Sequence, residues 1–146
     1  MSASDPELVQ LVDLWIEKAE EDLALAILAL EKADPCPFDL VCYHAQQCAE
    51  KCLKSYLVAR QVEFPWTHDL RVLTSAIEKI TGIASFCRDA GVLTVYASRI
   101  RYPYESPKSD RAEAERAANV AREVKKVVIA LLRCEGFDVG EKGRSK

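Results

Sequence analysis

The sequence has few glycines and histidines, and it lacks the apolar segments of membrane and secreted proteins. Glycine occurs 5 times and histidine twice in 146 residues. No apolar run approaches the roughly 18–20 residues that cross a membrane, so we expect no transmembrane helix. The first ten residues, MSASDPELVQ, lack a basic region followed by an apolar core, so no signal peptide is expected. These absences predict a cytoplasmic protein.

An excess of positive charge is also missing. The chain has 20 Lys and Arg against 23 Asp and Glu, which gives a formal net charge of −3. That balance argues against a protein that coats nucleic acid through bulk positive charge. A local basic patch stays open as an alternative.

The cysteines have none of the usual spacings of a structural site. Six are present and no two form a CxxC pair. A disulfide scaffold needs a secreted context, so we predict six reduced thiols that serve as small buried side chains. His44, Cys48 and Cys52 line one edge of a helix at i, i+4 and i+8, but zinc needs a fourth ligand and no recognised spacing supplies it. We therefore predict no metal and no cofactor.

The residues that are plentiful favour helix. Ala, Leu, Glu and Lys recur along the chain, and neither β-type alternation nor an internal repeat interrupts them. The sequence predicts an all-α protein, an up-and-down antiparallel bundle with four to five main helices. We expect one domain over residues 1–138 and a flexible C-terminal tail over residues 139–146.

Prolines and glycines mark the expected helix boundaries. Prolines at 35 and 37 separate a helix over residues 6–33 from one over residues 38–61. Thr67 is the predicted N-cap of a shorter third helix that continues to Ile80. A fourth helix is expected over residues 89–100, followed by the loop RYPYESPKSD. The last helix is expected over residues 109–135, with Gly136 as its stop.

The second predicted helix separates into an apolar and a polar face. Small and apolar side chains, Cys48 and Cys52 among them, fall on one face at 3.6-residue spacing. The opposite face carries Gln47, Glu50, Lys51 and Lys54, and Glu50 and Lys54 form an i,i+4 pair in the favourable order. A polar face of this kind predicts contact with solvent.

The stretch from His44 to Leu73 resembles the signature of the HEPN domain, the higher-eukaryote and prokaryote nucleotide-binding family. In that family a helix of the form QxAEKxLK is followed by a short loop and then THDL. The matching residues here include Gln47, Glu50, His68 and Asp69, and the sequence has cysteine at two positions where the family usually has alanine. His68 lies beside the predicted N-cap, so we expect it to bond nearby backbone or Asp69 in a structural role.

The resemblance implies a helical bundle that often dimerises and binds nucleotide or RNA. Many members pair with a minimal nucleotidyltransferase in toxin–antitoxin systems. Some are metal-independent ribonucleases that use an arginine, a polar residue, four to six further residues and a histidine at the start of the last helix. Here Arg99 and Arg101 are present, but no histidine follows either of them. Imidazole is the natural proton carrier near neutral pH, so we expect cleavage of RNA to be poor or absent.

The candidate binding residues gather around the loop before the last helix. Arg99 and Arg101 suit phosphate, and Tyr102 and Tyr104 suit stacking on a base. Lys51 and Lys54 would add positive charge if their helix face turned toward this loop. Tyr104 is also the candidate for a hydroxyl that a nucleotidyltransferase modifies, by resemblance to members whose loop tyrosine is adenylylated.

Three functions remain open from the sequence. The first is a nucleotide- or RNA-binding HEPN protein that acts with a nucleotidyltransferase, and the second is a ribonuclease with a base other than histidine. The third is a structural dimerisation module. A homodimer is expected from the resemblance and from apolar surface, for which Phe64 and Trp66 are the candidates.

Overall fold

The computed structural model describes residues 3–99, 102 and 108–140, and these form a helical bundle. Three helices are long, α1 (Pro6–Lys32), α2 (Phe38–Ala59) and α5 (Arg111–Cys134). The shorter elements are α3 (Leu70–Thr81), the 3₁₀ helix η1 (Arg88–Leu93) and α4 (Tyr96–Arg99). The described residues contain no strand, so the predicted all-α class is confirmed. Within the same ranges, no helix is long and apolar enough to span a membrane.

Two of the three long helices, α1 and α5, begin where a side chain satisfies one of their first amides, whereas α2 begins without a side-chain cap. Asp5 accepts a hydrogen bond from the amide of Glu7 at 3.1 Å, and Pro6 follows as the first helical residue. Asp110 does the same for Glu113 at the start of α5, at 2.8 Å. At the other end of α5, Gly136 has φ +90°, a left-handed conformation that glycine adopts without strain. These boundaries agree with those expected from the sequence.

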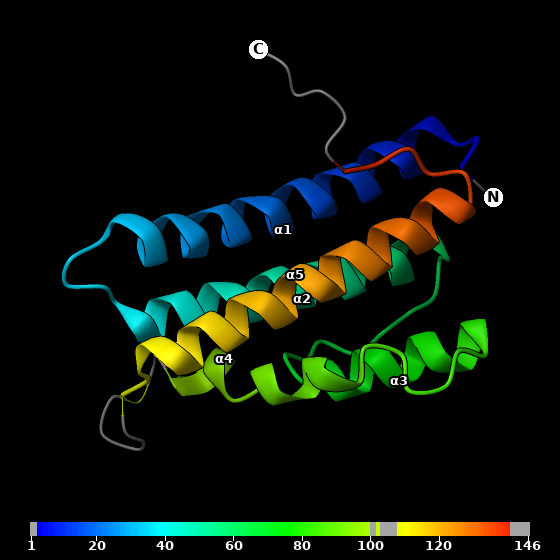
Figure 1. Cartoon of the computed structure of the whole chain (residues 1–146). Coiled ribbons are helices and arrows are strands. Elements are labelled where there is room, and N and C mark those ends of the chain that lie inside the picture. Colours follow the sequence, from blue (N-terminus) through cyan, green and yellow to red (C-terminus); the bar gives the residue numbers. More distant parts are fainter. Residues whose placement is uncertain (1–2, 100–101, 103–107, 141–146) are drawn as a thin grey trace, which may run out of the picture.

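The central element of the bundle is α2. It packs against α1, α3, α4 and α5, whereas α1 contacts only α2 and α5 among the longer helices. Figure 1 shows α1 along one side of the bundle, α2 and α5 in the middle, and α3 and α4 on the opposite side. Because neighbours surround α2, both of its faces are covered.

The predicted solvent contact of the second helix is therefore wrong in part. Glu50 and Lys54 are each only 5% exposed, and Gln47 and Lys51 are partly buried. The sequence pattern separated the two faces correctly, but it did not reveal that the loop before α3 covers Glu50 and Lys54 or that Lys51 pairs with a carboxylate of α1.

Two boundaries differ from expectation. The N-cap of α3 is Asp69, whose carboxylate accepts from the amide of Arg71 at 3.0 Å, while Thr67 accepts from Asp69 itself. The expected helix over residues 89–100 is divided into η1 and α4. At Gly91 an added Cβ would lie 2.8 Å from the side chain of Arg71, so this segment approaches α3 more closely than a larger residue allows.

The packed part of the chain extends beyond residue 138, since Val139 is fully buried and its carbonyl accepts from Arg133 at 3.0 Å. Residues 141–146 of the expected tail lie outside the described residues. All six cysteines are free thiols. Cys42, Cys48 and Cys52 are buried, but Cys36 and Cys87 are only partly buried and Cys134 is exposed, so the prediction that all six are buried is wrong in part. No group of three or more metal-ligating side chains occurs in the described ranges.

Candidate functional site

The start of the last helix holds a compact polar cluster around Arg99. The guanidinium donates to Glu113 Oε2 at 2.7 Å and to Ser109 Oγ at 3.3 Å. The Tyr96 hydroxyl donates to the same Glu113 oxygen at 2.6 Å, and the Arg99 guanidinium lies 5.1 Å from the Tyr96 ring. The amide of Ser109 donates to Asp39 at 2.8 Å, which fixes the start of α5 against α2.

The electrostatics of this cluster favour a charged Glu113. The hydrogen bond from Tyr96 lowers the pKa of the Glu113 carboxyl, and the Arg99 ion pair lowers it further. Burial and the same carboxylate raise the pKa of Tyr96. The positive charge of Arg99 is thus balanced within the protein, and its Nε is buried with no hydrogen-bond partner among the described residues.

Of the three other loop residues predicted to bind, the structure describes one, Tyr102. Tyr102 is 44% exposed, and its amide donates to the Arg99 carbonyl at 3.4 Å. Arg101 and Tyr104 lie outside the described residues. The structure therefore brings Arg99 into contact with α5 and places Tyr102 at the surface nearby.

The motif that spans α2 and the loop before α3 forms a second, buried cluster centred on Glu50. Its carboxylate accepts from Gln46 and Lys54 at 2.8 Å and contacts His68 Nδ1 at 2.9 Å. Lys54 Nζ also lies 5.9 Å from the rings of Phe64 and Trp66. His68 was expected to bond Asp69 or nearby backbone, and instead its ring joins the loop to α2.

The pKa of Glu50 reflects the balance of these contacts. Burial alone would raise the pKa, but hydrogen bonds from Lys54, Gln46 and His68 outweigh it and leave the pKa lowered. Glu50 is therefore held as a carboxylate and Lys54 as its counterion. This arrangement joins the loop to the helix, and it keeps Lys54 paired with Glu50.

Lys51 belongs to a third cluster, between α1 and α2. Asp22 accepts from Lys51 Nζ at 2.6 Å and contacts His44 Nδ1 at 2.8 Å. His44 thus bonds a carboxylate on α1. Asp39, which contacts the start of α5, lies about 18 Å along α2 from Lys51, so Lys51 is remote from the Arg99 cluster.

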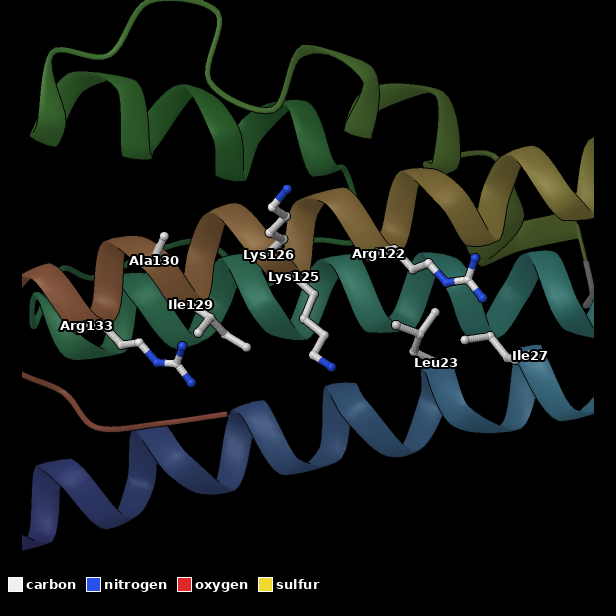
Figure 2. A pocket seen from close by; sticks show the side chains of 8 residues that line it. All are labelled: Leu23, Ile27, Arg122, Lys125, Lys126, Ile129, Ala130 and Arg133. Carbon is white, nitrogen blue, oxygen red and sulfur yellow. The ribbon is translucent and has the colours of Figure 1, made fainter. Parts of the chain in front are cut away.

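A further group of cationic side chains lies elsewhere, at a groove between α1 and α5. Figure 2 shows its lining, in which Arg122, Lys125 and Arg133 extend from α5 toward α1 while Lys126 points to the other side of α5. The groove encloses about 540 Å³ and has an apolar floor of Leu23, Ile27, Ile129 and Ala130. We call these eight residues the basic groove.

The basic groove is unevenly neutralised. Lys125 pairs with the buried Glu20 at 3.3 Å, and Arg133 donates to the Val139 carbonyl. Arg122 bonds the neutral side chain of Asn119 at 3.2 Å, so no carboxylate contacts it among the described residues. The sequence analysis missed this site. Its signal was the i, i+3, i+4 spacing of Arg122, Lys125 and Lys126, followed by Arg133 on the same helix.

Comparison with known proteins agrees with this architecture. The model of the HEPN domain family matches residues 12–132, more than four fifths of the chain. The chain belongs to the HEPN family. Its matched region runs from the first buried turns of α1 to the last turn of α5, so the HEPN domain includes all three clusters and seven of the eight residues of the basic groove, with Arg133 one residue beyond it. Neither a curated protein nor a solved structure matches the chain.

Proposed function

We propose that this HEPN protein binds nucleotide or RNA through phosphate contacts and does not cleave RNA efficiently. The observation that carries the proposal is the basic groove, because three cationic side chains, Arg122, Lys125 and Arg133, extend from α5 toward α1 in a protein whose net charge is −3. When a protein binds nucleic acid without sequence preference, its contacts with the phosphates supply most of the affinity.

The groove has the size and composition of a binding site. Its volume of about 540 Å³ lies within the range of small-molecule pockets, which is roughly 300–1,000 Å³. Arg122 supplies charge without an internal carboxylate partner in the described residues, while the apolar floor offers contact to a base or ribose. A phosphorylated ligand fits this combination better than an uncharged one does.

The predicted site at Arg99 is the second candidate for phosphate contact. Its guanidinium is already paired with Glu113 at 2.7 Å, so a phosphate would have to compete with that carboxylate. Both histidines of the chain bond other carboxylates, His44 with Asp22 and His68 with Glu50. These pairings support a binding function over ribonuclease chemistry at the start of α5.

The partners in the proposal follow from family membership. A homodimer that acts beside a minimal nucleotidyltransferase, in a toxin–antitoxin arrangement, is the assembly that the resemblance implies. Tyr104 remains the proposed hydroxyl for modification by that partner. Incubation with the nucleotidyltransferase and ATP, followed by mass spectrometry of wild type and Tyr104→Phe, would locate such a modification.

Binding of a fluorescent single-stranded RNA, followed by anisotropy over a range of salt concentrations, tests the site. We expect Arg122→Ala to weaken binding and to reduce the slope of log affinity against log salt by about 0.7, the share of one lost contact. Lys79→Ala is the matched control, because it removes the same charge from an exposed position of α3 and should leave the slope unchanged.

Three results would contradict the proposal. Equal losses in the groove and control variants would mean that only bulk charge matters. Loss in Arg99→Ala/Arg101→Ala with full binding by the groove variant would place the site at the predicted loop. Efficient cleavage by wild type that Arg99→Ala/Arg101→Ala abolishes would instead establish the ribonuclease alternative.

A further inference from the structure

The chain turns back along α5 after that helix ends. The amide of Gly136 donates to the Arg133 carbonyl at 3.0 Å. The amide of Phe137 donates to the Leu132 carbonyl at 2.9 Å, so the turn is joined to the last carbonyls of the helix. Residues 137–140 then run between α5 and α1 toward the basic groove (Figure 2). We call residues 137–140 the strap.

The strap is packed against one end of the basic groove. Phe137 is 3% exposed and Val139 is fully buried. Gly140 lies directly beside the groove, because a Cβ added there would be 3.1 Å from Ile129 Cδ1 and 3.2 Å from Arg133 Nη2. Ile129 belongs to the apolar floor of the groove, and Arg133 is one of its cations. The strap therefore limits how far a ligand can extend along the groove.

Arg133 is the groove cation that the strap contacts. Both Nε and Nη2 of its guanidinium donate to the Val139 carbonyl oxygen, at 3.2 Å and 3.0 Å. Two neighbouring N–H groups of arginine form the edge that binds phosphate through parallel hydrogen bonds. The Val139 carbonyl oxygen therefore occupies the place that a phosphate oxygen would take on this edge of Arg133.

We propose that the strap is an autoinhibitory segment, which competes with RNA for the groove and from which Val139 and Gly140 are displaced when RNA binds. This inference rests on the proposed phosphate binding and adds a means of regulating it. With the strap in place, a ligand meets a shortened groove and Arg133 is occupied. With the strap released, Arg133 and the floor around Ile129 become available. The strap follows the region that the HEPN model matches, so this device is an addition to that domain.

Opposing effects set the balance between the strap and a phosphate. A hydrogen bond from a guanidinium to a charged phosphate is about twice as strong as one to a neutral carbonyl, which favours the ligand. Burial of the Val139 side chain favours the strap, since its release returns apolar surface to water. Because the ligand interacts with the released state alone, it shifts the population toward that state.

Only the second half of the strap has to move. Phe137 is held by its backbone hydrogen bond to α5 and by burial of its ring. Val139 and Gly140 are held instead through contacts with the side chains of Arg133 and Ile129. Release of these two residues leaves Phe137 and the end of α5 in place, so the switch does not require the bundle to unfold.

Gly140→Val is the variant that displaces the strap without changing the charge of the groove. Gly140 has φ +92°, a left-handed conformation that a β-branched residue avoids, and the added carbons would meet Ile129. Gly82→Val is the matched control. Gly82 has φ +72° at the end of α3, and nothing lies within 4 Å of a Cβ added there. Both changes strain the backbone in the same way, but only Gly140 contacts the groove.

Anisotropy titrations of a fluorescent single-stranded RNA compare these variants with wild type. Gly140→Val should bind about threefold to tenfold more tightly, because Arg133 exchanges a neutral partner for a charged one. The slope of log affinity against log salt should steepen by about 0.7, the share of one added contact. Gly82→Val should bind like wild type, and Arg133→Ala added to Gly140→Val should cancel both gains. Val139→Thr, which places a hydroxyl in the buried site with little change of shape, should act in the same direction as Gly140→Val.

Nuclear magnetic resonance of the labelled full chain follows the strap directly. The amide signals of Val139 and Gly140 should move toward random-coil positions as RNA is added to wild type. Signals that stay in place at saturating RNA, or folded strap variants that bind no more tightly than wild type, would overturn the proposal and leave the strap a structural role only. The groove proposal would survive that result if Arg122→Ala still weakens binding. Absence of RNA binding by wild type and by both strap variants would reject the two proposals together.

Discussion

At the scale of single residues, the Glu50 carboxylate determines how the loop before α3 is attached to α2. It contacts Gln46, Lys54 and His68, which come from two turns of α2 and from the loop. Both members of the Glu50–Lys54 ion pair are about 6% exposed at the side chain. Removal of one partner from a buried pair leaves an uncompensated charge, which is more damaging than loss of the attraction itself.

Lys54→Ala is therefore expected to lower the free energy of unfolding by about 3–5 kcal/mol. Urea unfolding followed by circular dichroism measures this change. Glu115→Ala, which breaks the exposed pair of Arg111 and Glu115, is the control and should change stability by about 0–1 kcal/mol. Similar losses in the two variants would show that Lys54 is not buried in solution.

The lowered pKa of Glu50 predicts a dependence of stability on pH. Because the folded pKa lies below the ordinary value of 4.5, this carboxylate stabilises the fold above that pH, and the contribution is lost as the pH falls through the folded pKa. Glu50→Gln should lower stability at pH 7 and flatten the decline below pH 4.5. Urea unfolding at a series of pH values checks this, and an unaltered acid decline in the variant would contradict it.

The sequence predicted the identity of the Glu50–Lys54 pair but not its burial. Spacing along one helix determines which residues share a face, whereas burial depends on what the rest of the chain places over that face. The contact between His68 and Glu50 joins positions 18 residues apart, and no local pattern predicts it. The same applies to Arg99 and Glu113, whose pairing follows from how α4 meets α5.

At the scale of elements, the close packing of α5 against α2 depends on small side chains. Ala114, Ala117, Ala118 and Ala121 of α5 are all buried. They allow the two helix backbones to approach, and the cysteines of α2 serve the same purpose, since Cys48 and Cys52 are fully buried. The α2 side of this contact, with Cys48 and Cys52 on the apolar face, was predicted correctly, because 3.6-residue spacing is strong in long helices.

Ala121→Leu should destabilise the protein by about 1–3 kcal/mol, because the site has no room for the added carbons. Thermal unfolding of this variant can be compared with that of Ala112→Leu, an exposed position of the same helix. We expect the exposed change to be nearly neutral. An equally stable Ala121→Leu protein would mean that the two helices are further apart than described.

The short elements were predicted less well than the long ones. The segment over residues 89–100 was expected to be one helix, and it forms η1 and α4. A short apolar segment has few periods from which to identify a helix, and its course depends on contacts such as that of Gly91 with Arg71. The N-cap of α3 is Asp69 and not the predicted Thr67. Both side chains accept hydrogen bonds from local amides, so either could have been the cap.

At the scale of the whole molecule, charge is distributed in a way that the composition conceals. The net charge of −3 indicates an acidic protein, yet three cations of α5, Arg122, Lys125 and Arg133, extend toward α1 in the basic groove. The sequence analysis left a local basic patch open and assigned it to the loop near Arg99. Recognising the groove required knowledge of which face of α5 meets α1, and this comes from tertiary packing.

The central claim is that the protein binds RNA phosphates without cleaving the strand. One measurement tests it most directly, an anisotropy titration of end-labelled single-stranded RNA at several salt concentrations, with the RNA recovered from each sample and sized on a denaturing gel. We predict binding that weakens as salt increases, with RNA of full length in every sample. Absence of binding at low salt, or RNA fragments that accumulate with protein concentration, would contradict the account.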